Sequence, residues 1–217
     1  MLEFVPPSGS LVVSDVDDTI LETLILSNRE MLAHSLKNKH KAASGMPQLY
    51  ERISAQLHDR DGHKPAWLYL SGSPWGLQPF LMDFLYAYYP PPSAFVLSDI
   101  SLRSLRETAG TYDLKSYKQG QVREYMRRLP GKSLVLIGDA TQYDPDSYAA
   151  LYEEYPDNVL CILIREAQGS SAREKENAQN DMGRLRTAFK NVPQDRWRVF
   201  RHPSELVHID FSSKKCH

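Results

Sequence analysis

Long hydrophobic runs are missing from this chain of 217 residues. The longest, at residues 159–164, is far shorter than the roughly 20 residues that a membrane-spanning helix requires. Residues 1–7 contain neither a basic region nor an apolar core, so we expect no signal peptide. The sequence therefore predicts no transmembrane segment and a cytoplasmic protein, with peripheral contact with membranes as the open alternative.

The chain also has few cysteines and a small net charge. The two cysteines are Cys161, inside that apolar run, and Cys216, next to the last residue. So few cysteines do not suggest a disulfide framework, and a reducing compartment is the default expectation. The 26 lysines and arginines against 27 aspartates and glutamates give a net charge of −1. Because nucleic-acid-binding domains are normally basic, we expect no nucleic acid among the partners.

What the chain does contain is an alternation of strand and helix patterns. Its length predicts a single domain over residues 1–217, with its core at about residues 10–210. Near-continuous apolar runs predict buried parallel strands at residues 11–14, 66–70, 94–97, 133–137 and 159–164, and a weaker strand at 197–200. Helical spacing of apolar residues predicts helices at residues 46–57, 76–88, 118–129 and 146–155. The predicted fold class is therefore α/β, a doubly wound and mainly parallel sheet with helices on both faces.

Three stretches carry further expectations. The predicted helix at residues 76–88 is so apolar that we expect it to be well buried. The polar residues 168–181 indicate a solvated helix or a loop. We expect residues 213–217, at the end of the chain, to be frayed.

Polar side chains follow several of the predicted strands, at the end where such sheets bind ligands. Those that follow a strand, or precede the fourth strand in the case of the lysine, are Asp15, Asp17, Ser71, Lys118, Asp139 and Asp144. Each aspartate alone could be a turn former or a helix cap. The ordered set argues against that interpretation, because parallel strands bring all of its members to one edge of the sheet.

These residue types suit the handling of phosphate. Two carboxylates as close as Asp15 and Asp17 do not both ionise readily unless a cation lies between them. Mg²⁺ is a hard cation that prefers oxygen ligands, and Asp139 would complete its acidic cradle. Asp15 is then the candidate nucleophile toward phosphorus, and Asp17 is the candidate general acid. Ser71 and Lys118 are candidates for binding the phosphate oxygens.

This ordered set resembles the four motifs of the haloacid-dehalogenase-like hydrolase superfamily. The resemblance implies a Rossmann-like core, an aspartyl-phosphate intermediate on Asp15 and an acid/base role for Asp17. It also implies that Mg²⁺ is held by the Asp15 carboxylate, the Asp17 main-chain carbonyl and Asp139, and that Asp144 positions the metal or its waters. The residues implied to bind the substrate phosphate are Thr19, Ser71, Gly72 and Lys118.

A narrower resemblance extends over about residues 10–165, and its most specific segment is Ser-Gly-Ser-Pro-Trp at residues 71–75. Its other carriers are residues 14–20, 45–47, 117–118, 136–139 and 144–145, Tyr148, and residues 164–165. Together they are similar to the catalytic domain of the actin-patch phosphatidate phosphatases and their bacterial relatives. The resemblance implies a Mg²⁺-dependent enzyme that converts phosphatidate into diacylglycerol, with a phospholipid at a membrane surface as its partner. Ser98-Asp99 departs from it, since the family often carries Leu-Arg at the end of the third strand.

The spacing of the motifs bears on the size of the substrate. The intervals from Thr19 to Ser71 and from Ser71 to Lys118 are too short for a full cap domain, which favours a large substrate such as a lipid or a phosphoprotein. A soluble phosphometabolite is an alternative, as is a non-hydrolysing phospholipid-binding module on the same fold. Two side chains have open roles: Trp75 packs in the core or contacts a membrane, and Arg165 forms a structural ion pair or contacts the substrate.

Overall fold

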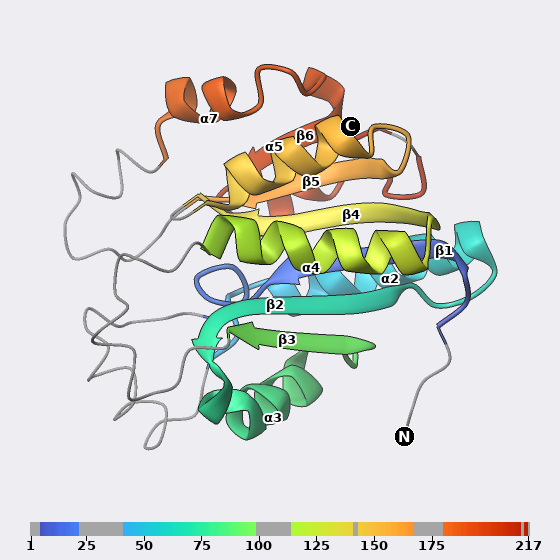
Figure 1. Cartoon of the computed structure of the whole chain (residues 1–217), viewed down its shortest axis with the longest axis vertical. Coiled ribbons are helices and arrows are strands. Elements are labelled where there is room, and N and C mark those ends of the chain that lie inside the picture. The colour runs from blue at the N-terminus through green and yellow to red at the C-terminus, as the bar shows by residue number, and fades with distance from the viewer. Residues whose placement is uncertain are drawn as a thin grey trace.

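The computed structural model of the chain describes residues 5–21, 41–98, 114–140, 143–166, 180–213 and 215–216. Its centre is a sheet of six strands in the order β3-β2-β1-β4-β5-β6 (Figure 1). Every neighbouring pair of strands is parallel. The strands are β1 (Ser8–Asp15), β2 (Ala66–Pro74), β3 (Ala94–Ser98), β4 (Gly131–Asp139), β5 (Val159–Arg165) and β6 (Trp197–Phe200). Each lies where the sequence predicts a strand, and the sheet has the predicted doubly wound α/β architecture.

Helices cover both faces of this sheet. In Figure 1, α2 lies behind the sheet, whereas α4 and α5 lie in front of it. The side chains of α3 share a core with α2, and those of α7 share a core with α4 and α5. The helices are α2 (Met46–Asp61), α3 (Gln78–Tyr88), α4 (Leu114–Arg128), α5 (Asp144–Glu154) and α7 (Met182–Ala188), with short 3-10 turns at η1 (Trp75–Leu77), η3 (Gln194–Arg196) and η4 (Pro203–Leu206). Nowhere in the described part of the chain is a helix both long enough and apolar enough to cross a membrane.

The strand residues alternate between the two cores. In β1, Val12 faces the core shared with α2 and α3, whereas Leu11 and Val13 face the core shared with α4, α5 and α7. Both faces of the strand are therefore buried in apolar surroundings. This double burial is the reason that the strands are near-continuous hydrophobic runs in the sequence.

Helix α3 is less buried than its composition suggests. Leu81, Phe84 and Leu85 are buried, but Tyr86 is 61% exposed and Tyr88 is 44% exposed. The helix lies beside β3, the edge strand of the sheet, so only one side of it meets the core (Figure 1). The prediction of a well-buried helix is wrong for this reason.

The expectation that the chain has no disulfide is also wrong, because Cys161 of β5 is bonded to Cys216. The two residues are 55 positions apart, and the chain returns across α2 to bring them together. On that path, the Phe211 N–H donates to Gln56 Oε1 at 2.9 Å, and the Arg52 guanidinium lies over the Phe211 ring. Cys216 is fully buried, so the end of the chain is not frayed at this residue. Disulfides persist mainly in oxidising compartments, so the pair argues against the expectation of a reducing one.

The site lies between β1 and β4, where the order in which strands are added to the sheet reverses. From β1 the chain continues through β2 to β3 on one side, and from β4 it continues through β5 to β6 on the other side. Doubly wound sheets bind ligands at such a reversal, beyond the carboxyl ends of the strands. Asp15 and Asp139 end these two strands.

The described parts of the two intervals between the motifs hold only elements of the core fold. These elements are α2 and most of β2 in the first interval, and the end of β2, η1, α3, β3 and the start of α4 in the second. The rest of these intervals, residues 22–40 and 99–113, lies outside the described residues. The polar stretch predicted as a helix or loop also lies outside them up to residue 179.

Candidate active site

The loop after β1 turns back sharply and fixes the Asp15 carboxylate. Asp18 has a φ of 59°, in the left-handed region, and the Ile20 N–H donates to the Val16 carbonyl at 3.1 Å. Aspartate adopts this region more readily than most other residues with a side chain. The turn brings Thr19 next to the strand end, where Thr19 Oγ1 donates to Asp15 Oδ2 at 2.9 Å.

Lys118 bridges two acidic residues of the site. It lies on α4, is 3% exposed, and its Nζ donates to Asp15 Oδ1 and to Asp144 Oδ1, both at 2.6 Å. Burial alone would lower the pKa of Lys118, but the charges of Asp144 and Asp15 hold that pKa above its ordinary value. Lys118 therefore stays protonated and positively charged inside the site.

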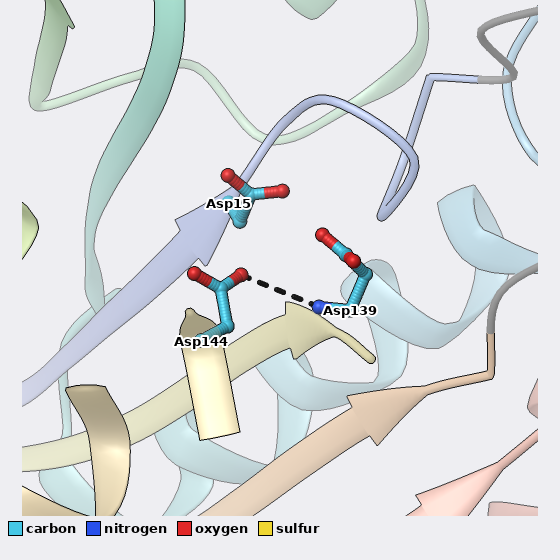
Figure 2. A group of neighbouring side chains, drawn as sticks. All are labelled: Asp15, Asp139 and Asp144. Atoms are coloured by element: carbon cyan, nitrogen blue, oxygen red, sulfur yellow. Dashed lines mark hydrogen bonds between the residues drawn. The ribbon is translucent and has the colours of Figure 1, made fainter. Parts of the chain in front are cut away.

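Asp139 and Asp144 meet because a glycine lets α5 begin against the end of β4. A Cβ atom on Gly138 would lie 2.3 Å from Asp144 Oδ2, so a larger residue would push the two elements apart. The Asp139 N–H donates to Asp144 Oδ2 at 3.3 Å, the dashed line in Figure 2. Asp15, Asp139 and Asp144 each offer an oxygen atom, and these atoms all lie within 4.8 Å of one another. Figure 2 shows the three side chains converging from β1, β4 and α5.

The buried charges of the site do not balance. Asp15, Asp139 and Asp144 are at most 2% exposed, so when ionised they carry three buried negative charges. The buried cations Lys118 and Arg165 offset two of these charges and leave one unbalanced. Burial raises the pKa of Asp15 to about 7 and that of Asp144 to about 6, although Lys118 opposes both shifts. A divalent cation would supply the missing charge, and carboxylate oxygens are the ligands that Mg²⁺ prefers. The described residues therefore fit a site for a divalent cation.

Asp17 is held by two serines at the end of β2. Ser71 Oγ donates to Asp17 Oδ2 at 2.6 Å, and Ser73 Oγ donates to Asp17 Oδ1 at 3.2 Å. The Ser73 N–H donates in turn to Ser71 Oγ at 2.9 Å. Ser71 is predicted to bind phosphate, whereas here its hydroxyl proton points to Asp17. The role of Ser73 was not predicted, although alternate residues of an extended segment point to the same side, which is a usable signal.

Gly72 and Ser98 join the ends of β2 and β3. Ser98 Oγ donates to the Gly72 carbonyl at 2.9 Å and to the Ser73 carbonyl at 3.2 Å. The serine that departs from the family pattern thus supports the segment that holds Asp17. Asp99 lies outside the described residues, and the role of Gly72 in phosphate binding stays a prediction.

Two arginines contact the loops of the site through main-chain carbonyls. Arg165, the buried last residue of β5, donates from Nη1 to the carbonyls of Asp18 at 2.9 Å and Thr19 at 3.2 Å. Arg184 of α7 donates from Nη2 to the carbonyl of Ala140, which directly follows Asp139. Neither contact was predicted, and in the case of Arg184 no sequence signal exists, because its partner lies 44 positions away.

Two exposed aromatic residues lie at this edge of the sheet. Trp75 follows β2 and is 62% exposed, and Tyr143 directly precedes α5 and is 53% exposed. Trp75 therefore does not pack in the core. β1, which carries Asp15, lies between β2 and β4, so the strand order places the two aromatic residues on either side of the acidic site.

The structure thus gathers most of the predicted site residues at one place. The residues joined by the contacts above are Asp15, Asp17, Thr19, Ser71, Lys118, Asp139 and Asp144. They come from β1 and its loop, β2, α4, β4 and α5.

Comparisons with known proteins show the family of this chain. Residues 10–166 match the protein family described as "Phosphatidate phosphatase APP1, catalytic domain". The chain is 23% identical over 171 residues to "Phosphatidate phosphatase APP1" of Saccharomyces cerevisiae, an alignment that covers 75% of this chain and 27% of that protein. It is 25% identical over 167 residues to "Uncharacterized protein C29B5.04c" of Schizosaccharomyces pombe, covering 73% of this chain and 25% of that protein. The chain thus spans about a quarter of the length of these relatives.

Proposed function

We propose that this chain, which belongs to the family of the phosphatidate phosphatase APP1 catalytic domain, hydrolyses phosphate monoesters at the acidic site between β1 and β4. One observation supports this most: a single loop presents two carboxylates in different surroundings. Asp15 is buried against Lys118 and Thr19, whereas Asp17 receives hydroxyl hydrogen bonds from β2. Two carboxylates in unlike environments are typical of a site that needs a nucleophile and a separate acid.

In the proposed reaction, one carboxylate oxygen of Asp15 attacks phosphorus while the ester bond between phosphorus and the leaving oxygen breaks. Asp17, in its protonated form, gives its proton to that oxygen, so the alcohol leaves and an aspartyl-phosphate remains on Asp15. Asp17, now ionised, takes a proton from the water that attacks the aspartyl-phosphate. The products are inorganic phosphate and the regenerated carboxylate of Asp15.

The surrounding residues orient the phosphate and balance its charge. An ammonium group has three N–H donors, and Lys118 uses two of them on Asp15 and Asp144 in the described structure. The third suits a phosphate oxygen. The Ser71 hydroxyl can turn from Asp17 to the phosphate when Asp17 is protonated and no longer needs a donor.

The reaction as proposed depends on Mg²⁺. The residues that would hold it are Asp15, Asp139 and Asp144, with the main-chain carbonyl of Asp17 as a further ligand. Bound there, the ion would offset the repulsion between the carboxylates and the incoming phosphate. The excess of negative charge among the buried residues supports this requirement.

We infer phosphatidate at a membrane surface as the substrate, with diacylglycerol as the other product. The family description and the name of the Saccharomyces relative support the lipid, and so does the absence of a cap domain from the described parts of both intervals between the motifs. Trp75 and Tyr143 support the surface, because exposed tryptophan and tyrosine side chains favour the membrane–water interface. A protein with this role would be a peripheral membrane protein.

Phosphate release from a panel of substrates tests this proposal. The panel contains phosphatidate micelles, a phosphopeptide, a sugar phosphate and an aryl phosphate, each with Mg²⁺. We expect the highest kcat/KM on phosphatidate, because a lipid aggregate offers binding energy that orients the phosphate at Asp15. A preference for the phosphopeptide or the sugar phosphate would support phosphatase activity but contradict phosphatidate as the substrate. If no substrate of the panel released phosphate, the proposed hydrolysis would be contradicted, and a non-hydrolysing phospholipid-binding module would be the remaining alternative.

A matched pair of aromatic variants tests the membrane contact. Trp75→Ala should lower the rate on micellar phosphatidate and spare the aryl phosphate. Tyr86→Ala is the control, because Tyr86 is as exposed as Trp75 but belongs to α3 rather than to the edge with the site. Equal effects of the two substitutions on phosphatidate would contradict a specific role for Trp75.

A further inference from the structure

Arg165 makes an unusual contact for a charged residue at the end of a buried strand. It is 6% exposed, and from β5 its Nη1 donates to the main-chain carbonyls of Asp18 and Thr19. The Arg165 carbonyl in turn accepts from the Ala140 N–H at 2.9 Å. One residue therefore touches both loops that carry the acidic side chains, the loop after β1 and the loop after β4.

The carbonyls that Arg165 holds belong to the strained part of the first loop. Asp18 is the one residue other than glycine with a positive φ in the described part of the chain. Its φ sets the direction of the preceding peptide group, which contains the Asp17 carbonyl, and its ψ sets the direction of its own carbonyl. A donor that fixes the Asp18 carbonyl therefore favours one orientation of the whole turn. Backbone in a sparsely populated region persists only where its surroundings hold it there.

We propose that Arg165 is a positioning residue, whose guanidinium holds the Asp18 turn so that the Asp17 carbonyl and the Asp15 carboxylate face a common cation. This inference rests on the proposed function, because a directed Asp17 carbonyl matters only if a cation binds there. It assigns Arg165 a role through the main chain rather than a contact with the substrate. Outer groups that orient metal ligands typically change metal affinity or activity by about 10-fold to 100-fold when substituted.

Arg196 of η3 is a matched control that contacts the other end of the same strand. Its Nη1 donates to the carbonyl of Val159, the first residue of β5, at 2.7 Å. Arg165 and Arg196 thus make the same kind of hydrogen bond, from a guanidinium to a main-chain carbonyl. Of these two arginines, Arg165 is the one near the acidic site. Lysine at either position keeps the charge and removes the planar guanidinium, so the two substitutions make the same chemical change.

The test compares Arg165→Lys and Arg196→Lys with the parent protein in the absence of substrate. Mn²⁺ binding is titrated by electron paramagnetic resonance with Mg²⁺ as competitor, and thermal unfolding is measured in EDTA. We expect Arg165→Lys to weaken Mn²⁺ and Mg²⁺ binding by about 10-fold to 100-fold, and Arg196→Lys to keep the parent affinity. With an aryl phosphate at saturating Mg²⁺, Arg165→Lys should lower kcat more than it changes KM, because the phosphate-binding side chains are unaltered.

The outcomes separate this inference from the proposed function. Parent affinity for Mn²⁺ in a folded Arg165→Lys protein would overturn the inference alone, as would equal losses in the two arginine variants. A parent protein that binds neither ion would overturn the proposed function together with it. If Arg165→Lys does not fold, Asp18→Gly decides, because glycine accepts the same φ but leaves the turn free to adopt others. We expect several-fold weaker Mn²⁺ binding in Asp18→Gly, and parent affinity there would overturn the inference.

Discussion

The two edges of the sheet both hold charged groups, but among the described residues only the carboxyl edge has more buried negative charge than positive charge. At the amino edge, Asp61 accepts hydrogen bonds from Arg60 Nε at 2.7 Å and from Ser10 Oγ, with the buried Lys132 close by. Burial alone would raise the pKa of Asp61, but Arg60 and Ser10 hold that pKa below its ordinary value. At the carboxyl edge the outcome is the opposite, and burial raises the pKa of Asp15 to about 7.

This difference separates a structural charge cluster from a functional one. A carboxylate with enough donors and positive charges around it stabilises the fold, and nothing further needs to bind there. A group of buried carboxylates with too little positive charge destabilises the fold until a cation arrives. Perturbed carboxylates of this second kind cluster at functional sites.

The largest expected effect is the loss of turnover in Asp15→Asn. An amide is not a nucleophile, and removing a covalent nucleophile can cost more than about 10⁴-fold in kcat. Phosphate release from an aryl phosphate measures this loss. Asp61→Asn, the same substitution at the amino edge, should retain the parent rate. Activity of Asp15→Asn above a few percent of the parent would mean that a water, rather than Asp15, attacks phosphorus.

The next effect distinguishes the two carboxylates within the carboxyl edge. Asp17→Asn should lower the hydrolysis of an alkyl phosphate by about 10²-fold to 10⁴-fold, because an alkoxide needs a proton to leave. The loss should be smaller in the first step with an aryl phosphate, whose leaving group needs no proton. A phosphorylated protein should then accumulate and be visible by mass spectrometry. Equal losses in the rate of that first step for both substrates would contradict the general acid.

The third effect is on stability, and it has opposite signs at the two edges. The folded-state pKa of Asp15 lies above its unfolded value of 3.8, so in EDTA its contribution to stability is lost as the pH rises between about 4 and 7. At pH 7, Asp15→Asn should therefore raise the free energy of unfolding, by up to about 4 kcal/mol. Denaturant unfolding in EDTA at several pH values measures this. A difference from the parent that does not change with pH would contradict the raised pKa.

The smallest effect is the counterpart at the amino edge. The folded-state pKa of Asp61 is lowered, so its contribution is present above its unfolded pKa and is lost as the pH falls. Asp61→Asn should lower the free energy of unfolding at pH 7 by about 1–2 kcal/mol, since the charge-assisted hydrogen bonds are partly exposed to solvent. The same unfolding series measures it. An increase in stability would show that Asp61, like Asp15, is an unbalanced charge.

The strands and the gathering of the acidic residues could be predicted because each depends on a local pattern. A strand buried on both faces is a continuous apolar run, and parallel strands bring the residues that follow them to one edge. The proximity of Asp15 and Asp139 could therefore be predicted without knowledge of the tertiary structure. Asp144 could be placed near them because it lies only five residues after Asp139.

What could not be predicted depends on the paths of chain segments far apart in the sequence. The disulfide requires the end of the chain to return to β5, and two cysteines in 217 residues carry no sign of that path. The contact of Arg184 with Ala140 is equally remote. The exposure of Trp75 depends on where the turn after β2 lies, which composition does not reveal.

The most direct test of the central claim measures phosphate release from phosphatidate micelles with Mg²⁺, with EDTA and with Ca²⁺ alone. Mg²⁺ requires a tight octahedral arrangement, whereas the larger Ca²⁺ takes more oxygen ligands and should draw the Asp15 carboxylate away from attack. The account predicts release with Mg²⁺ and almost none in the other two conditions. Full release in EDTA, or with Ca²⁺ alone, would contradict a magnesium-dependent phosphatase at the carboxyl edge of the sheet.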